Sequence, residues 1–264
     1  MKKIGFLLLS LGFFSASCSS DDSNGNTTVN STTFLPLADG NYWVYNVDNE
    51  TLQDGRDSLY VANDTIIGVS AYKKLKTKFV ANGFFSGALS NNSARIAGDE
   101  LLVSGEAAIP FSADFPVSIP IFEFTIFKES ATVNTMLDQA TGTLNQSYQG
   151  YPLAFDYTLT TTAKEDLATY TVEGQSYNNV KRVETVLKLK ISTSITSGGI
   201  TIPITILQEQ NVVVSSQYYA DGIGVVHVVT DLDYQLDPLF SGQLPVPQSA
   251  SEHQEEVLDD YNVD

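Results

Sequence analysis

The chain has 264 residues, of which 31 are acidic and 14 are basic, so its formal charge is −17 at pH 7. This excess of negative charge repels phosphate backbones and anionic lipid surfaces, which excludes nucleic-acid binding and attachment to a membrane through a basic patch. The sequence contains a single cysteine, which excludes an internal disulfide or a redox thiol pair.

The first residues have the pattern of a secretory signal peptide. Lys2 and Lys3 precede an apolar run, Ile4 to Phe14, that only Gly and Ser interrupt. A helix of about eleven residues would span roughly 16 Å, far short of the ~30 Å hydrocarbon core of a bilayer. The positive start, the short apolar segment and the small residues after it predict a signal peptide over residues 1–17, with a hydrophobic first strand as the alternative.

The only cysteine, Cys18, follows the small residues 15–17. An exported chain can form disulfides, so a lone cysteine at the cleavage junction is expected to be modified there. The segment SASC resembles the lipobox of bacterial lipoproteins, although Ser15 stands where that motif usually has Leu. The resemblance implies cleavage before Cys18 and acylation of its thiol, with palmitate among the acyl chains that anchor the protein. An ordinary secreted protein with a stray thiol is the alternative.

Residues 18–33 are rich in Ser, Asn, Thr and Asp, which predicts a flexible tether with a reach of about 20 Å. Ser19 stands in place of the aspartate that retains lipoproteins in the inner membrane. Asp21 and Asp22 resemble the acid-rich export tract of Gram-negative bacteria that display lipoproteins on the cell surface. The expected location is the outer membrane, lipid-anchored and facing outward; a solvated linker with two aspartates is the alternative.

Residues 34–236 are expected to form one all-β domain without an internal linker, a common length for such domains. Apolar residues alternate with polar ones in Leu75–Phe79, Leu153–Leu159 and Val183–Ile191, as in strands with one buried face. Clusters of Gly, Asn and Asp separate these runs. We predict a single antiparallel, strongly curved sheet or half-barrel, with a β-sandwich as the alternative. The best helix candidate is Thr132–Ala140.

Two short motifs lie near the two ends of this domain. DGNYWVYNV and YYADGIGVVHV resemble the first and last strands of uncharacterised bacterial lipoproteins, which are suspected to form a half-barrel like that of periplasmic lipoprotein carriers. The resemblance implies a curved antiparallel sheet and carries no activity. The only tryptophan, Trp43, shares a strand face with Tyr45 and Val47, which predicts a core residue and not a sugar-binding platform.

Two triplets, Asp57–Leu59 and Asp64–Ile66, resemble the Asp-Ser/Thr-apolar acceptor of general O-glycosylation in the same kind of bacteria. They make Ser58 and Thr65 candidate glycosylation sites. Ordinary strand ends are the alternative interpretation, because such triplets arise readily in a chain rich in Ser and Thr.

Two proline-containing segments, Ile109–Phe127 and Ile200–Leu207, are more apolar than a one-faced strand needs. Proline cannot donate a ladder hydrogen bond, so these segments belong at edges, strand starts or covering loops. A strongly bent sheet would leave apolar surface uncovered. We expect the two segments to rim an apolar cavity without histidine or a convergent carboxylate pair; simple closure of the core is the alternative.

Motifs of serine hydrolases, zinc proteases and nucleotide-binding proteins are absent from the sequence. His227 shares a strand face with Asp231, yet strand neighbours on one face are about 6–7 Å apart, too far to share one ion without other ligands. The alternating acids that follow, Asp231 to Asp237, lack the Gly and terminal Glu of an EF-hand. We therefore predict no catalytic residue, no metal site and no cofactor.

The last residues, 237–264, are Pro-rich and then acidic, which predicts a solvated tail, with a short helix after Ser249 as the alternative. Taken together, the patterns predict a membrane-anchored lipoprotein with a non-catalytic binding role. Its partner would be an apolar ligand or an envelope protein. An unrecognised hydrolase of surface polymers such as glycans is the alternative, because a pair of glycosidase carboxylates leaves no linear signature.

Overall fold

The computed structural model describes residues 33–264, except residues 52, 110–116, 149, 241 and 243–245. Its strands are β1 (Tyr42–Asn49), β2 (Gly55–Ile67), β3 (Ser70–Thr77), β4 (Ser93–Ala97), β5 (Glu100–Ile109), β6 (Val117–Lys128), β7 (Met136–Tyr148), β8 (Tyr151–Val172), β9 (Gln175–Ser197), β10 (Ile200–Ala220), β11 (Gly224–Gln235) and β12 (Ser249–Asn262). Helix α1 spans Phe84–Ser90, and a single 3-10 turn spans Pro238–Phe240. The predicted signal peptide, Cys18 and nearly all of the tether lie outside the described residues.

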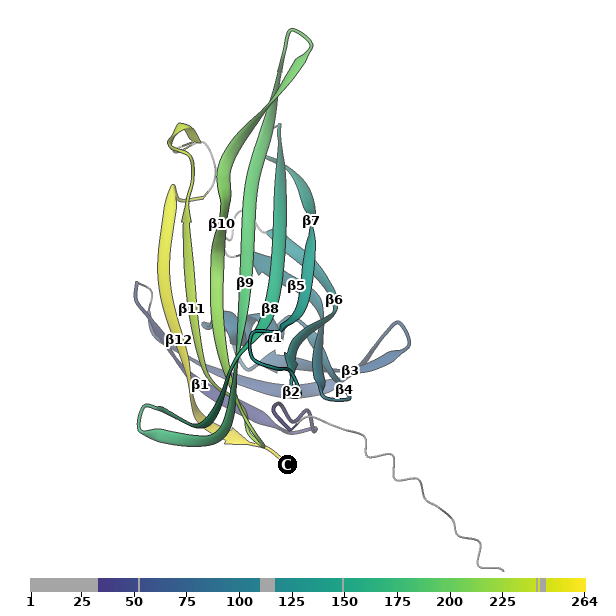
Figure 1. Ribbon diagram of the computed structural model, residues 1–264, viewed down its shortest axis with the longest axis vertical. Helices are drawn as coiled ribbons and strands as arrows, with labels where there is room; N and C mark the ends of the chain where they lie inside the picture. The colour runs from purple at the N-terminus through teal and green to yellow at the C-terminus, as the bar shows by residue number, and fades with distance from the viewer. Residues whose placement is uncertain (1–32, 52, 110–116, 149, 241, 243–245) are drawn as a thin grey trace, which may run out of the picture.

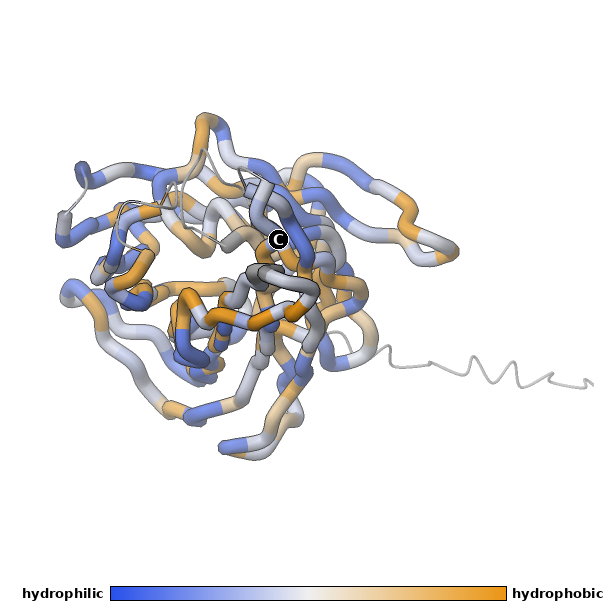
Figure 2. The backbone as a smooth tube through the Cα atoms, turned by 90° about the horizontal axis from the view of Figure 1, so that it is seen from above, coloured by the Kyte–Doolittle hydropathy of each residue, from blue (hydrophilic) through white to orange (hydrophobic). Residues whose placement is uncertain are grey.

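All twelve strands belong to one sheet, in the order β6-β5-β4-β3-β2-β1-β12-β11-β10-β9-β8-β7. The pairings are antiparallel, and the sheet curls until it is nearly closed and barrel-shaped (Figure 1). Along the backbone, hydrophobic and hydrophilic residues alternate (Figure 2), as expected where one face of each strand is buried. The all-β prediction is confirmed.

Strand β12 corrects the predicted boundary of the domain. Residues expected to form a solvated tail instead pair with β1 on one side and with β11 on the other, in the middle of the sheet. The side chains of Gln254, Glu256, Val257 and Leu258 are buried. The tail prediction is wrong because two polar side chains of this strand face the interior, where they bind the backbone of α1.

The two ends of the sheet overlap instead of joining through a ladder. β6 contacts β8 and β9 as well as β7. Its apolar residues pack with those of β8 and β9 in one buried cluster. The backbone N–H of Thr125 donates to the Asp138 carboxylate at 2.9 Å, and the Thr161 hydroxyl donates to the Thr125 carbonyl at 2.6 Å. The first part of β6 therefore packs against β8 and β9 in this cluster, hereafter the upper cluster.

A second buried cluster closes the lower end, near the C-terminus in Figure 1. Phe34 and Leu35 lie in this cluster together with Trp43, whose indole N–H donates to the Ile223 carbonyl at 2.6 Å. Gly224 has φ +121°, and a Cβ there would lie 2.7 Å from the indole nitrogen, so this turn requires glycine. The prediction of Trp43 as a core residue is confirmed, since it is fully buried.

The predicted helix at Thr132–Ala140 is wrong, because β7 begins at Met136. The structure instead places its α-helix at Phe84–Ser90, between β3 and β4. Phe85 and Leu89 are buried in the lower cluster, so this short helix packs against the inner face of the sheet. A helix of this length is not stable by itself and depends on such packing.

Candidate binding site

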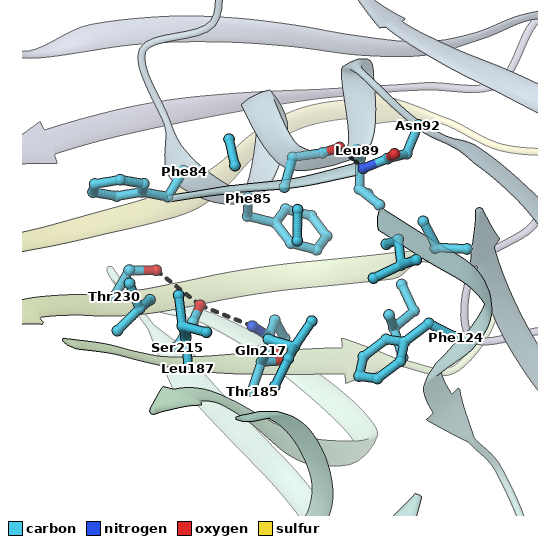
Figure 3. A pocket seen from close by; sticks show the side chains of 18 of the residues that line it. Phe84, Phe85, Leu89, Asn92, Phe124, Thr185, Leu187, Ser215, Gln217 and Thr230 are labelled. Atoms are coloured by element: carbon cyan, nitrogen blue, oxygen red, sulfur yellow. Dashed lines mark hydrogen bonds between the residues drawn. The ribbon is translucent and has the colours of Figure 1, made fainter. Parts of the chain in front are cut away.

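A cavity of about 170 Å³ lies inside the curved sheet, between α1, β5, β6 and the wall formed by β9–β11 (Figure 3). Phe84, Phe85 and Leu89 of α1 line one side. Ile121, Phe124 and Ile126 of β6 line another, and Leu187 and Val213 line the opposite wall. The residues that line the cavity in the described part of the chain include no charged side chain and no histidine.

The cavity exists because α1 is held at its N-terminal end by three side chains of the sheet. Asp57 of β2 accepts the backbone N–H groups of Asn82 and Gly83 at 2.8–3.0 Å. Gln254 of β12 accepts the Phe84 N–H at 2.7 Å. The free N–H groups at a helix start thus find acceptors that lie far away in the sequence.

Glu256 of β12 completes this anchor. It accepts the N–H groups of Phe85 and Ser86 at 2.6 and 3.1 Å, and the Ser86 hydroxyl at 2.6 Å. Burial raises the pKa of the Glu256 carboxyl to about 7, against the opposing effect of these hydrogen bonds and with a smaller contribution from the negative Asp57. A Cβ on Gly83 would lie 2.2 Å from this carboxylate, so glycine lets the chain approach it.

The C-terminal end of α1 is tied to β5 through Asn92. The Asn92 amide donates to the carbonyls of Ala88 and Glu106 at 2.8 and 2.9 Å, and its oxygen accepts the Glu106 N–H at 2.6 Å. Gly105 has φ +143°, and a Cβ there would lie 1.9 Å from the Asn92 oxygen. Both ends of the helix are therefore fixed, which leaves the space between α1 and the opposite wall open.

A row of polar side chains runs along the β9–β11 wall (Figure 3). The Thr185 hydroxyl donates to the Gln217 oxygen at 3.3 Å, and the Gln217 amide donates to the Ser215 hydroxyl at 2.8 Å. The Ser215 and Thr230 hydroxyls lie 2.8 Å apart and share a hydrogen bond. An otherwise apolar cavity with a few aligned polar groups has the usual composition of a small-molecule site.

Small residues lie where the cavity meets the surface. Ala88 of α1 and Ala108 of β5 line the cavity and are exposed, and Ala107 beside them is half-buried. These three alanines mark the mouth of the cavity.

Of the two segments predicted to rim a cavity, one does and one does not. Residues 121, 124 and 126 of β6 confirm the first, whereas residues 110–116 of that segment lie outside the described residues. The second prediction is wrong: Ile206 and Leu207 are buried in the upper cluster, while Ile200 and Ile202 are exposed on the β9–β10 hairpin. No carboxylate of the described residues lines the cavity, as expected for this site.

His227 does not approach Asp231. Its Nδ1 lies 2.6 Å from the Tyr170 hydroxyl, and its Nε2 lies 3.1 Å from the Glu255 carboxylate. Burial lowers the pKa of His227, so the neutral ring accepts from the tyrosine and donates to the glutamate. Asp231 instead binds His253, at 2.6 Å. This cluster fastens the β8–β9 hairpin to β11 and β12.

Nothing in the described part of the chain brings together three His, Cys, Asp or Glu side chains that could hold a metal ion. The buried carboxylates Asp57 and Glu256 both bind backbone N–H groups at the start of α1, and neither lines the cavity. This pair therefore anchors the helix. Acid–base catalysis by two carboxylates would need groups that face a substrate.

The two candidate glycosylation residues both lie on β2. Ser58 is half-buried near the start of the strand, between the buried residues Asp57 and Leu59. Thr65 is half-buried near the β2–β3 hairpin, next to the exposed Ile66. Modification at either position stays a prediction.

Comparison with protein-family models, with curated proteins and with solved structures finds no match for this chain. None of the helices in the described residues is long and apolar enough to cross a membrane. The function therefore has to be argued from the cavity itself.

Proposed function

We propose that this chain is a lipid-anchored, non-catalytic binding protein that holds a small apolar molecule in the cavity between α1 and the β9–β11 wall. The observation that carries this proposal is an interior space of about 170 Å³ with an apolar, uncharged lining. An apolar cavity of about 150 Å³ is enough to bind benzene in another protein. A single ring or a short alkyl segment is therefore the expected size of the occupant.

The composition of the lining favours binding over catalysis. Hydrolysis of a glycan or an ester needs a positioned acid, base or nucleophile beside the substrate. The polar side chains of this lining are neutral: Asn92, Thr185, Ser215, Gln217 and Thr230 are hydrogen-bonded to one another or to the backbone, and burial raises the pKa of the Tyr219 hydroxyl. Such groups orient a ligand without transferring protons at neutral pH.

We further propose that acylated Cys18 attaches the domain to the outer membrane, on its outward side. Support comes from the sequence pattern around Cys18 and from the negative charge, which leaves acyl chains as the means of attachment. The first described residues, Thr33 to Leu35, lie at the lower end of the sheet. A flexible tether from this point would hold the domain close to the membrane.

Removal of the acylation site tests the anchor. Replacing Cys18 by alanine is expected to leave the chain unprocessed or to release it from the outer-membrane fraction, because no acyl chain can be attached. The measurement is cell fractionation together with a fatty-acid label, with Ser20→Ala as the matched control. Unchanged fractionation and an unlabelled wild type would contradict the proposed anchor.

A bulky side chain at the mouth tests the cavity. Replacing Ala88 by tryptophan is expected to weaken the binding of toluene by at least about tenfold, because the indole would occupy the entrance; tenfold corresponds to about 1.4 kcal/mol. Calorimetric titration gives the affinity, and the exposed Ala71 of β3, changed to tryptophan, is the matched control. A folded Ala88→Trp protein with wild-type affinity would show that the ligand binds elsewhere.

A further inference from the structure

We infer that the cavity selects ligands that carry a neutral hydrogen-bond acceptor, such as a carbonyl, ester or ether oxygen, on an apolar body. This inference rests on the proposed binding function. It starts from the row Thr185–Gln217–Ser215–Thr230, which crosses an otherwise apolar wall.

The row has more donors than it uses. Its three hydroxyls and one amide group carry five N–H and O–H hydrogens in total. In the described part of the chain these side chains form three hydrogen bonds, all with one another. One hydrogen of the Gln217 amide and one hydroxyl hydrogen of the Ser215–Thr230 pair are left over. Because Gln217, Ser215 and Thr230 are each more than nine-tenths buried, these donors gain from an acceptor that enters the cavity.

The direction of the hydrogen bonds supports this assignment. Gln217 donates to Ser215, so the Ser215 hydroxyl hydrogen is free to point to Thr230, and the Thr230 hydrogen then points away from the row. If Thr230 donates instead, the Ser215 hydrogen is the one left over. Either arrangement leaves one hydroxyl donor and one amide donor in the same row on the cavity wall, and each can bind an acceptor oxygen of the ligand.

The surroundings argue against a charged ligand. No lysine or arginine lines the cavity, so a carboxylate would lose its hydration without a cation to replace it. Asp57 and Glu256, at the N-terminal end of α1, the helix that lines one side of the cavity, add no positive charge that would hold an anion. An ammonium group fits no better, because it would lose its hydration in a lining that offers no carboxylate to pair with it.

A matched series of single-ring probes tests the inference: toluene, acetophenone, benzoate and benzylammonium. Their affinities for the purified protein at neutral pH are measured by calorimetric titration or by shifts of methyl signals in NMR spectra. We expect acetophenone to bind about three- to tenfold more tightly than toluene, as one net hydrogen bond allows. Benzoate and benzylammonium are expected to bind more weakly than toluene.

A variant without the row separates the hydrogen bonds from the cavity. In Thr185→Val/Ser215→Ala/Gln217→Met/Thr230→Val all donors of the row are removed together, a change that leaves no polar partner unpaired. It should bind toluene at least as well as the wild type and lose the preference for acetophenone. Thr141→Val, at an exposed position of β7, is the control and should keep the preference. If the fourfold variant fails to fold, Ser215→Ala/Thr230→Val, which removes both hydroxyls that can supply the spare hydroxyl hydrogen, should still reduce the preference.

The outcomes distinguish the two proposals. If toluene does not bind at all, the proposed function is wrong, and the inference falls with it. If toluene binds but acetophenone binds no more tightly, or if benzoate equals acetophenone, the cavity binds apolar molecules and the inference about the acceptor is wrong. If the fourfold variant retains the preference for acetophenone, residues outside the row bind the acceptor oxygen of the ligand, which also overturns the inference.

Discussion

Replacing Glu256 by alanine is expected to lower the free energy of unfolding by about 3–9 kcal/mol. The carboxylate accepts three hydrogen bonds at the start of α1, and each buried donor left without an acceptor costs about 1–3 kcal/mol. Because the total stability of a domain is typically about 5–15 kcal/mol, this single change removes a large part of it. Denaturant unfolding followed by circular dichroism measures the effect.

The exposed Glu209 of β10 provides the control for this prediction. Its ion pair with Lys188 is long, at 3.6 Å, and both side chains are largely exposed. Glu209→Ala should therefore change the stability by no more than about 0.5 kcal/mol. A loss below about 1 kcal/mol in Glu256→Ala would mean that the carboxylate does not hold the helix.

The same residue makes stability depend on pH, which gives the prediction a second readout. The pKa of Glu256 is about 7 in the folded chain, against an ordinary value of 4.5, so the folded state binds more protons between these two pH values. The contribution of Glu256 is therefore most favourable below pH 4.5 and decreases as the pH rises to 7, by up to about 3 kcal/mol. Glu256→Gln should remove this part of the pH dependence.

Much of the sheet could be predicted from the sequence because its buried face is apolar in long strands. Leu153, Phe155 and Leu159 are buried as expected, and so are Val183, Leu187, Leu189 and Ile191. The pattern in Leu75–Phe79 was right for Leu75 and wrong for Phe79, which lies beyond the end of β3 and is exposed. Alternation indicates which face is buried, whereas the end of a strand depends on pairing with its neighbours.

The candidate site could not be predicted from local patterns, because its determinants are distant in sequence. Helix α1 has seven residues, too few to show a helical period of apolar residues in the sequence, and its N-cap residue, Gly83, has no side chain that could cap it. The acceptors that hold it come from β2 and β12, more than a hundred residues apart from each other. Ser215 and Gln217 present the opposite problem: polar residues at alternate positions normally indicate a solvent face, yet here they face the cavity.

Deletion of residues 249–264 is expected to abolish folding. β12 pairs with β1 and with β11, so its loss would open the sheet at the centre and create two new unpaired edges. The buried side chains of Val257 and Leu258 contribute about 1.5–3 kcal/mol each, and the anchors Gln254 and Glu256 of α1 would be lost with them. These losses together approach or exceed the whole stability of a typical domain.

The measurement is the far-ultraviolet circular dichroism spectrum and the thermal unfolding of the truncated chain, compared with a chain that lacks only its last residue. Asp264 lies beyond β12, and its backbone N–H donates to the Asn41 side chain at 3.2 Å, so the control should retain the sheet with a small loss of stability. A cooperative unfolding transition in the chain that ends at residue 248 would mean that β1 and β11 do not need β12. The acidic C-terminal segment would then be the solvated tail that its composition alone suggests, and the interior anchor of α1 would have to come from elsewhere.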